Sequence, residues 1–218
     1  MHIVFLVFPN VTQLDMTGPA QVLSRLPGAS VSYVAKTHDP VPTDSGFSIL
    51  PTATFDAIQQ ADVLCIPGGF GIVDVMADPE SLSFVRRIAA GANYITSVCT
   101  GALVLGAAGC LEGRRATTHW AYHDLLADAG AIPTQGRYVQ HGKLMTGGGV
   151  TAGIDFGLAL ARLIVGEPLV QSIANALEYD PEPPVRFNRE QAASDPVMQR
   201  RFEKPVADTR DALKAALR

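Results

Sequence analysis

The sequence predicts an α/β fold in which a mainly parallel sheet is covered by helices on both faces. Short apolar runs of strand length alternate with longer helical patterns along most of the chain. Hydrophobic residues make up 47% of the 218 residues and charged residues 17%, which is too apolar and too weakly charged for a disordered chain. A chain of this length forms one large domain or two small ones.

The first elements follow from local patterns near the N-terminus. The apolar segment 2–8 is predicted to be a strand, because it lacks the basic region and the cleavage site of a signal peptide. A helix is expected over 19–26 with Pro19 at its first position, where proline is favoured. A second strand is expected over 30–36, and 46–55 is expected to form a short hairpin or an extended excursion.

The later elements continue the alternation of strands and helices. Glycine and proline mark most of the boundaries between them. The predicted strands are 62–67, 94–98 and a strand ending at 144–146, and the predicted helices are 79–90, 101–108, 151–165 and 167–178.

The C-terminal tail differs from the rest in composition. Eight basic and seven acidic residues fall among the 39 residues from Asp180 to Arg218. We therefore divide the chain into a domain at 1–185 and a tail at 186–218, with an amphipathic helix over 206–217. The mixed charges predict a solvated packing arm or a subunit contact, not a membrane anchor.

Composition also limits the class of protein. A net charge of −4 argues against a nucleic-acid-binding protein, which is usually basic. Three cysteines cannot all pair within one chain, so a reducing cytoplasm is the expected compartment. The longest apolar run, near 101–111, is far shorter than the roughly 20 residues that a membrane span needs.

Cys99 is the candidate nucleophile, because it lies where a strand pattern meets a helix pattern with no loop between them. The small residues Ser97 and Gly101 flank it at two positions on either side, as in a nucleophile elbow. The first N–H groups of the following helix are expected to favour the thiolate. The alternative is a buried cysteine that acts as a small hydrophobic residue, which is what we expect of Cys65 and Cys110.

Ligands of parallel α/β sheets bind at the carboxyl ends of the strands, and two further segments lie there. Asp15 follows the first strand, either as a residue of the helix entry or as a carboxyl group that exchanges a proton with Cys99. Gly68 and Gly69 either end a strand or offer a backbone N–H that forms an oxyanion-type donor pair with that of Thr100.

His119 and His123 have the spacing of two zinc ligands on one helix face. Trp120 stands where a zincin would have glutamate, and no third ligand is evident, so we expect no metal. His119 is alternatively the partner of Cys99 in a Cys–His dyad.

The segment 147–152 matches the pattern G-x-G-x-x-A of dinucleotide-binding sites. The following segment 167–178 has a helical pattern, whereas a dinucleotide site would need a second strand there. The glycines are therefore expected to let the backbone pack closely beside a site and to start the helix at 151.

At these residues the chain resembles the ThiJ/PfpI superfamily, which has the fold of class I glutamine amidotransferases. The resemblance covers about 1–185 and implies a flavodoxin-like three-layer sandwich with a nucleophile elbow, assembled as a homodimer. The stretches that carry it are 13–19, 62–69, 96–109, 115–123, 146–157 and 178–184.

The chain has Asp15 where most members of the superfamily have glutamate. In this it resembles the branch that hydrates isonitriles (R–N≡C) to N-substituted formamides. This branch implies a hydro-lyase with a small-molecule isonitrile substrate and neither metal nor organic cofactor. Matching positions imply that Cys99 is the nucleophile, Asp15 the acid and base, and Thr100 a residue that positions and polarises the reacting groups. The implied substrate or oxyanion contacts are Gly69, Gly148 and Val150.

The chemistry agrees with these residue types. A thiolate attacks the isonitrile carbon while Asp15 delivers a proton, and water then hydrolyses the thioimidate with Asp15 as base. Asp15 must then start protonated, through burial or the adjacent thiolate. One rival is the sensor domain of AraC-type regulators, although the 40 residues after Glu178 are too few for the DNA-binding module. A second rival is a glyoxalase-like or stress-response member of the superfamily.

Overall fold

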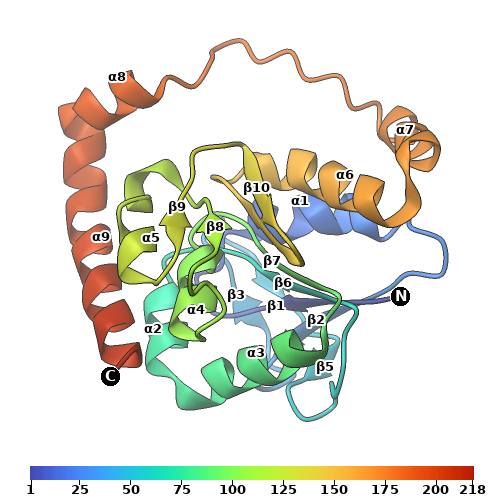
Figure 1. Cartoon of the computed structure of the whole chain (residues 1–218), viewed down its shortest axis with the longest axis horizontal. Coiled ribbons are helices and arrows are strands. Elements are labelled where there is room, and N and C mark those ends of the chain that lie inside the picture. The colour runs from blue at the N-terminus through green and yellow to red at the C-terminus, as the bar shows by residue number, and fades with distance from the viewer.

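The computed structural model describes all 218 residues and contains a seven-stranded sheet between two layers of helices (Figure 1). Its order is β10–β11–β7–β6–β1–β2–β5, and every neighbouring pair is parallel except β10 and β11. The inner order β2–β1–β6–β7–β11 is the 2-1-3-4-5 order of flavodoxin-like folds. The strands are β1 (His2–Leu6), β2 (Ser30–Ala35), β5 (Ala53–Thr54), β6 (Val63–Ile66), β7 (Tyr94–Ser97), β10 (Tyr138–His141) and β11 (Leu144–Gly147).

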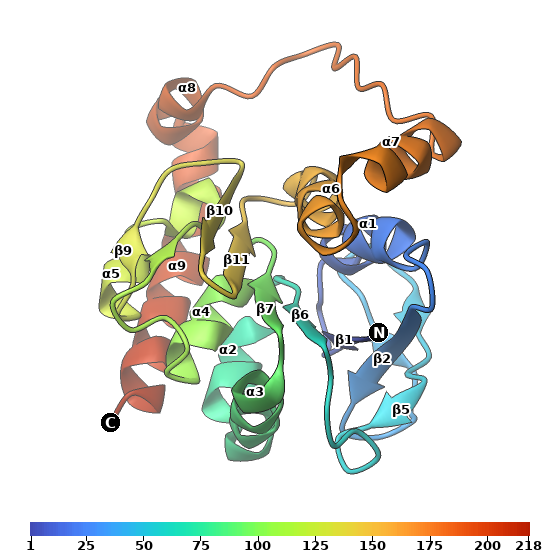
Figure 2. The same cartoon turned by 45° about the vertical axis from the view of Figure 1, so that its right-hand side comes forward.

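Helices cover both faces of the sheet, as predicted (Figures 1 and 2). The central strand β6 is buried at every residue, which is why its sequence is apolar throughout and does not alternate. One face carries α1 (Gln13–Leu23) and α6 (Ala152–Val165), and the other carries α2 (Ile72–Ala77), α3 (Pro79–Gly91) and α4 (Gly101–Ala107).

The prediction that the first helix begins at Pro19 is wrong. Helix α1 begins at Gln13, so that Asp15 lies in its first turn and Pro19 lies in its interior. A proline there removes a helical hydrogen bond, but it also packs against the glycines of α6. A Cβ atom on Gly153 would lie 3.0 Å from Pro19 Cδ, and one on Gly157 would lie 3.1 Å from Pro19 Cα. This close packing of two helices overrides the local preference of proline for a helix start.

The segment 46–55 does not pair with itself. Strand β4 (Ser48–Ile49) pairs with β3 (Val41–Pro42) outside the main sheet, whereas β5 joins the edge of the main sheet beside β2. The other small elements are the parallel pair β8 (Arg115–Ala116) and β9 (Ile132–Pro133), a 3₁₀ turn at Trp120–Tyr122, and α5 (Leu125–Asp128).

The tail returns to the sandwich. After α7 (Glu167–Ala176), an extended segment crosses the molecule to α8 (Arg189–Ser194) and α9 (Pro196–Ala216) (Figure 2). Helix α9 starts ten residues before the predicted 206 and packs on α2, α4 and α5, with Leu213 fully buried. The apolar face of α9 is therefore buried against the domain at 1–185 of the same chain.

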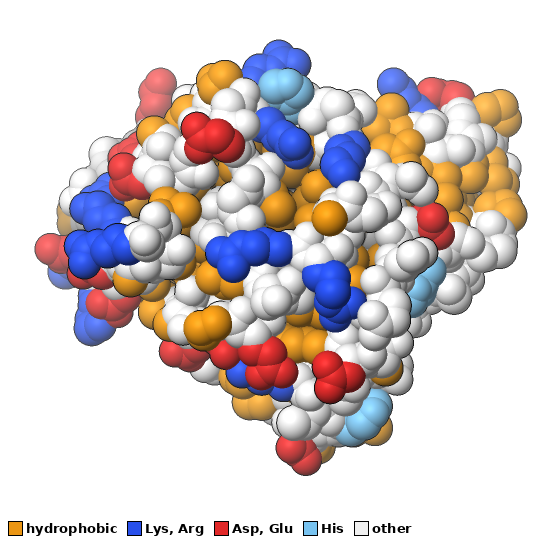
Figure 3. Space-filling model, turned by 60° about the horizontal axis from the view of Figure 1, so that its bottom comes forward, with side chains coloured by type: hydrophobic (Ala, Val, Ile, Leu, Met, Phe, Trp, Pro, Cys, Tyr) orange, Lys and Arg blue, Asp and Glu red, His pale blue; other side chains and the backbone are white.

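No helix has both the length and the apolar character that crossing a bilayer would require. On the face shown in Figure 3, acidic and basic side chains are interspersed among hydrophobic ones, so that this face presents no continuous basic field.

Candidate active site

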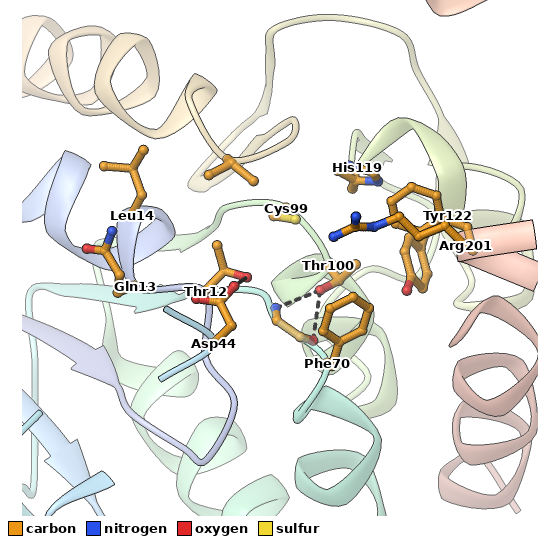
Figure 4. Close-up of a pocket in the computed structure, with 13 residues that line it drawn as sticks. Thr12, Gln13, Leu14, Asp44, Phe70, Cys99, Thr100, His119, Tyr122 and Arg201 are labelled. Carbon is orange, nitrogen blue, oxygen red and sulfur yellow. Dashed lines mark hydrogen bonds between the residues drawn. The ribbon is translucent and has the colours of Figure 1, made fainter. Parts of the chain in front are cut away.

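The carboxyl ends of β1, β6, β7 and β11 meet at one edge of the sheet, where the strand order reverses between β1 and β6. A cavity of about 360 Å³ opens there, and Cys99 lies on its floor (Figure 4). The structure thus brings the predicted site residues together, with Asp15 and Gly148 behind the cavity wall. The residues that line the cavity are Thr12, Gln13, Leu14, Asp44, Gly69, Phe70, Cys99, Thr100, His119, Tyr122, Val150, Arg201 and Phe202.

Cys99 adopts the left-handed backbone conformation of an elbow, with φ at 56°. Three hydrogen bonds hold this strained residue. Its N–H donates to the carbonyls of Gly147 (3.1 Å) and Gly148 (2.8 Å), and its carbonyl accepts from Thr118 Oγ1 (2.7 Å). Only glycine fits at position 101, because a Cβ atom there would lie 2.1 Å from the Ile66 carbonyl oxygen.

Cys99 is 6% exposed, and opposing effects act on the pKa of its thiol. Burial and the neighbouring Asp15 raise the pKa, whereas the N–H groups of Thr100 and Val150 lower it. The first two effects prevail, so that the pKa lies well above the ordinary value. The expected effect of the N–H groups at the helix start is present, because the Thr100 N–H lowers the pKa of the Cys99 thiol. Burial and the adjacent carboxyl group outweigh it, so that the thiol keeps its proton.

Asp15 is 1% exposed, and burial raises the pKa of its carboxyl group to about 7. Its Oδ2 accepts a hydrogen bond from the Gly68 N–H (3.0 Å), while Oδ1 has no hydrogen-bond partner. The carboxyl group lies near enough to Cys99 for each to shift the pKa of the other. Near neutral pH the two groups together hold one or two protons, and such a pair can both deliver and accept a proton.

Thr100 joins the elbow to the loop after β6. Its Oγ1 accepts a hydrogen bond from the Gly69 N–H (3.1 Å; Figure 4). A Cβ atom on Gly68 would lie 2.6 Å from the same oxygen, so a side chain at position 68 would clash with Thr100. The Gly148 N–H donates to the Arg137 carbonyl (2.9 Å). Gly69 and Gly148 therefore offer no free donor to an oxyanion, contrary to expectation: Gly69 forms part of the wall, and the carbonyl of Gly148 holds the elbow.

His119 forms no hydrogen bond with Cys99, so the Cys–His dyad is absent. Its Nδ1 accepts from the Ala121 N–H (3.3 Å), and burial lowers its pKa to about 4, which keeps the ring neutral at pH 7. The expected helix face with His123 does not exist, because a 3₁₀ turn separates the two residues and His123 Nε2 pairs with the Thr134 carbonyl (3.3 Å). No group of three or more His, Cys, Asp or Glu side chains is placed to hold a metal ion.

The cavity wall opposite Leu14 is formed by α9 of the tail, and the sequence did not predict it. Arg201 and Phe202 line the cavity from α9, about 100 residues after Cys99 in the sequence. Figure 4 shows Arg201 across the cavity from Leu14. Phe202 packs among His119, Trp120 and Tyr122, with ring centroids 5.3, 5.5 and 6.1 Å away, and we call these four residues the aromatic cluster. The amphipathic pattern of the tail was the only signal, and it does not say which surface a helix covers.

Comparisons with known proteins agree with this geometry. The model of the DJ-1/PfpI family matches residues 1–163. The chain is 54% identical to the isonitrile hydratase of Pseudomonas putida, over 84% of this chain and 81% of that protein. It is 28% identical to the HTH-type transcriptional regulator CdhR of Pseudomonas aeruginosa, over 78% of this chain and 52% of the regulator. A crystal structure of a ThiJ/PfpI family protein from Pseudomonas syringae matches with a TM-score of 0.88 and 42% identity, over 99% of this chain and 89% of that chain. The chain therefore belongs to the DJ-1/PfpI family.

Proposed function

We propose that this protein is a hydro-lyase that hydrates isonitriles to N-substituted formamides without a cofactor. The observation that carries the proposal is the buried Asp15 carboxyl beside the elbow thiol, with its pKa raised to about 7. The reaction needs a nucleophile, an acid and then a base, and this pair supplies all three. The relative from Pseudomonas putida bears the name of this activity and favours it over a sensor or a glyoxalase-like enzyme.

In the first step, the pair starts as thiol and carboxylate, and Asp15 takes the thiol proton. This differs from the expectation that Asp15 starts protonated, because the pKa of Cys99 is raised well above its ordinary value while that of Asp15 is about 7. The sulfur forms a bond to the terminal carbon of R–N≡C, and Asp15 delivers the same proton to that carbon. The product is the thioimidate R–N=CH–S–Cys99, and Asp15 is again a carboxylate. The N–H groups of Thr100 and Val150, which approach the sulfur, stabilise the thiolate while it forms.

In the second step, Asp15 acts as base toward water. It takes one proton as the oxygen adds to the imidate carbon, and this proton passes to the nitrogen to give R–NH–CH(OH)–S–Cys99. The carbon–sulfur bond then breaks, the hydroxyl proton returns through Asp15 to the sulfur, and R–NH–CHO leaves. One water has been added, and the thiol and the carboxylate are restored.

The test is to incubate the purified protein with cyclohexyl isonitrile and to follow the formamide by mass spectrometry. Water labelled with ¹⁸O should place the label in the formamide, and Cys99→Ala should give no product. Tight binding of the isonitrile without turnover would overturn the proposal in favour of a sensor. Turnover of a 2-oxoaldehyde but of no isonitrile would instead favour a glyoxalase-like enzyme.

We also propose that the chain works as a homodimer in the cytoplasm. The dimer rests on the family resemblance, and the compartment on three cysteines that all remain unpaired. Sedimentation velocity at micromolar concentration should give a species of twice the 23.1 kDa chain mass. A species of 23.1 kDa would contradict the dimer.

A further inference from the structure

We propose that Arg201 determines substrate specificity by binding a carboxylate at the far end of the substrate. The preferred substrates are then isonitriles with an apolar body and a terminal anionic group. This inference rests on the proposed hydratase function and names the substrate class of the same site.

The position of Arg201 is the first observation. It lies on α9 in the tail, it lines the same cavity as Cys99, and its side chain extends from the tail toward Cys99 (Figure 4). Arg200 precedes it on the same helix and does not line this cavity. The sequence therefore places one of two adjacent arginines on the site.

The second observation is that nothing in the chain neutralises this guanidinium. Arg137 and Arg210 pair with Asp155 and Asp128, whereas Arg201 makes neither an ion pair nor a hydrogen bond. Asp44 is the one carboxylate among the lining residues, and its Oδ2 accepts a hydrogen bond from Thr12 Oγ1 on the opposite wall (2.7 Å; Figure 4). A cation that faces a largely apolar cavity without a partner is suited to an anion brought by the ligand.

The chemistry at Cys99 sets the direction in which the substrate binds. The isonitrile carbon must reach the sulfur, so the R group projects away from it along His119, Tyr122 and Phe202, toward the tail. The opposite orientation would bring a carboxylate against the negative charge that Asp15 and Cys99 share. Electrostatics therefore oppose the wrong orientation and favour the one in which the carboxylate meets Arg201.

The test uses isocyanoacetate, 4-isocyanobutanoate and 6-isocyanohexanoate, each beside its methyl ester, with cyclohexyl isonitrile as a neutral reference. We expect at least one acid to exceed its ester in kcat/KM by roughly tenfold, as for one partly exposed charged pair. Arg201→Gln should abolish that preference through KM with kcat unchanged, because the contact is present in both ground and transition states. Arg201→Lys should retain part of it, and the control Arg200→Gln should retain all of it.

The two proposals fail in different ways. If cyclohexyl isonitrile and the esters are hydrated but no acid is preferred, or if the preference survives in Arg201→Gln, the role of Arg201 is overturned and the hydratase function stands. If no isonitrile is hydrated at all, both are overturned. Thermal melts of the variants should match that of the wild type, because Arg201 is exposed and takes part in neither a hydrogen bond nor an ion pair.

Discussion

The two walls of the cavity differ in how they are built. At the wall formed by strand ends, Thr100 and Cys99 are 4% and 6% exposed, and Asp15 behind them is 1% exposed. Hydrogen bonds to backbone groups hold the elbow and the loop beside it. On the wall formed by the tail, Arg201 is exposed and Phe202 is half-buried, and Phe202 packs on the rings of His119, Trp120 and Tyr122.

The two walls are therefore expected to have different roles, one in the chemistry and the other in substrate binding. A raised carboxyl pKa needs a buried and rigid position, which the strand ends provide. The residues that α9 brings to the cavity lie outside the sheet, so they can change without disturbing it. We therefore expect changes to the strand-end wall to alter kcat and changes to the tail wall to alter KM.

The largest effect is expected from Cys99→Ala, which removes the nucleophile and should leave less than a few per cent of turnover. Cys65→Ala and Cys110→Ala are the matched controls and should keep substantial activity. The Cys65 thiol lies inside β6, accepts a hydrogen bond from Thr96 and has a pKa raised to about 12 by burial. An equal loss in either control would show that the wrong cysteine was chosen.

Asp15→Asn comes next. It keeps the shape of the side chain but removes the titrating proton, so kcat should fall by roughly 10²–10⁴. A folded variant within a factor of about five of the wild type would reject the acid–base role.

The same variant should be more stable than the wild type at pH 8. The folded pKa of Asp15 is about 7 and its ordinary value is 3.8, so the folded wild type loses stability as pH rises from 4 to 7. The full decrease in the free energy of unfolding is on the order of 4 kcal/mol. Asp15→Asn does not show this decrease, because asparagine does not ionise. Urea unfolding at pH 4 and pH 8 measures the difference, which should be confined to pH 8. A variant that is less stable at pH 8 would mean that Asp15 stabilises the fold.

The pH dependence of the wild type provides a third test of the strand-end wall. Asp15 must be a carboxylate to take the thiol proton, so kcat/KM should rise about a hundredfold from pH 5 to pH 8, with a midpoint near the Asp15 pKa of about 7. His119, with its pKa lowered to about 4, should not contribute in this range. Activity that falls from pH 6 to pH 8 would require a protonated Asp15 in the resting enzyme.

The smallest effect is expected from the tail wall. Phe202→Ala opens the aromatic cluster and should raise KM for cyclohexyl isonitrile about three- to tenfold while kcat stays within twofold. Phe187→Ala is the control, because Phe187 lies beside Trp120 and lines a neighbouring cavity only. A loss of kcat in Phe202→Ala without a change in KM would mean that the tail takes part in the chemistry.

Much of the fold could be predicted because its signals are local. The central strand β6 is a continuous apolar run and β1 is apolar after His2. The elbow is visible in the sequence as a strand pattern followed by a cysteine between small residues. A tight turn excludes side-chain bulk whatever surrounds it, as the 2.1 Å clash at Gly101 shows. The catalytic pair could be named for a related reason: carboxyl ends of parallel strands meet at one edge of a sheet.

The remainder depended on contacts between distant segments. Pro19 lies inside a helix because glycines of α6 pack against it. The N–H groups of Gly69 and Gly148 are already bound, to Thr100 Oγ1 and to the Arg137 carbonyl. The N–H groups near the Cys99 sulfur are therefore those of Thr100 and Val150. Residue type and spacing could nominate Asp15 and Cys99, but burial decided which of them holds the proton. The wall formed by the tail could not be predicted either. An amphipathic pattern shows that one face of a helix is buried, but only the tertiary structure determines which surface that face covers, and α9 covers this cavity.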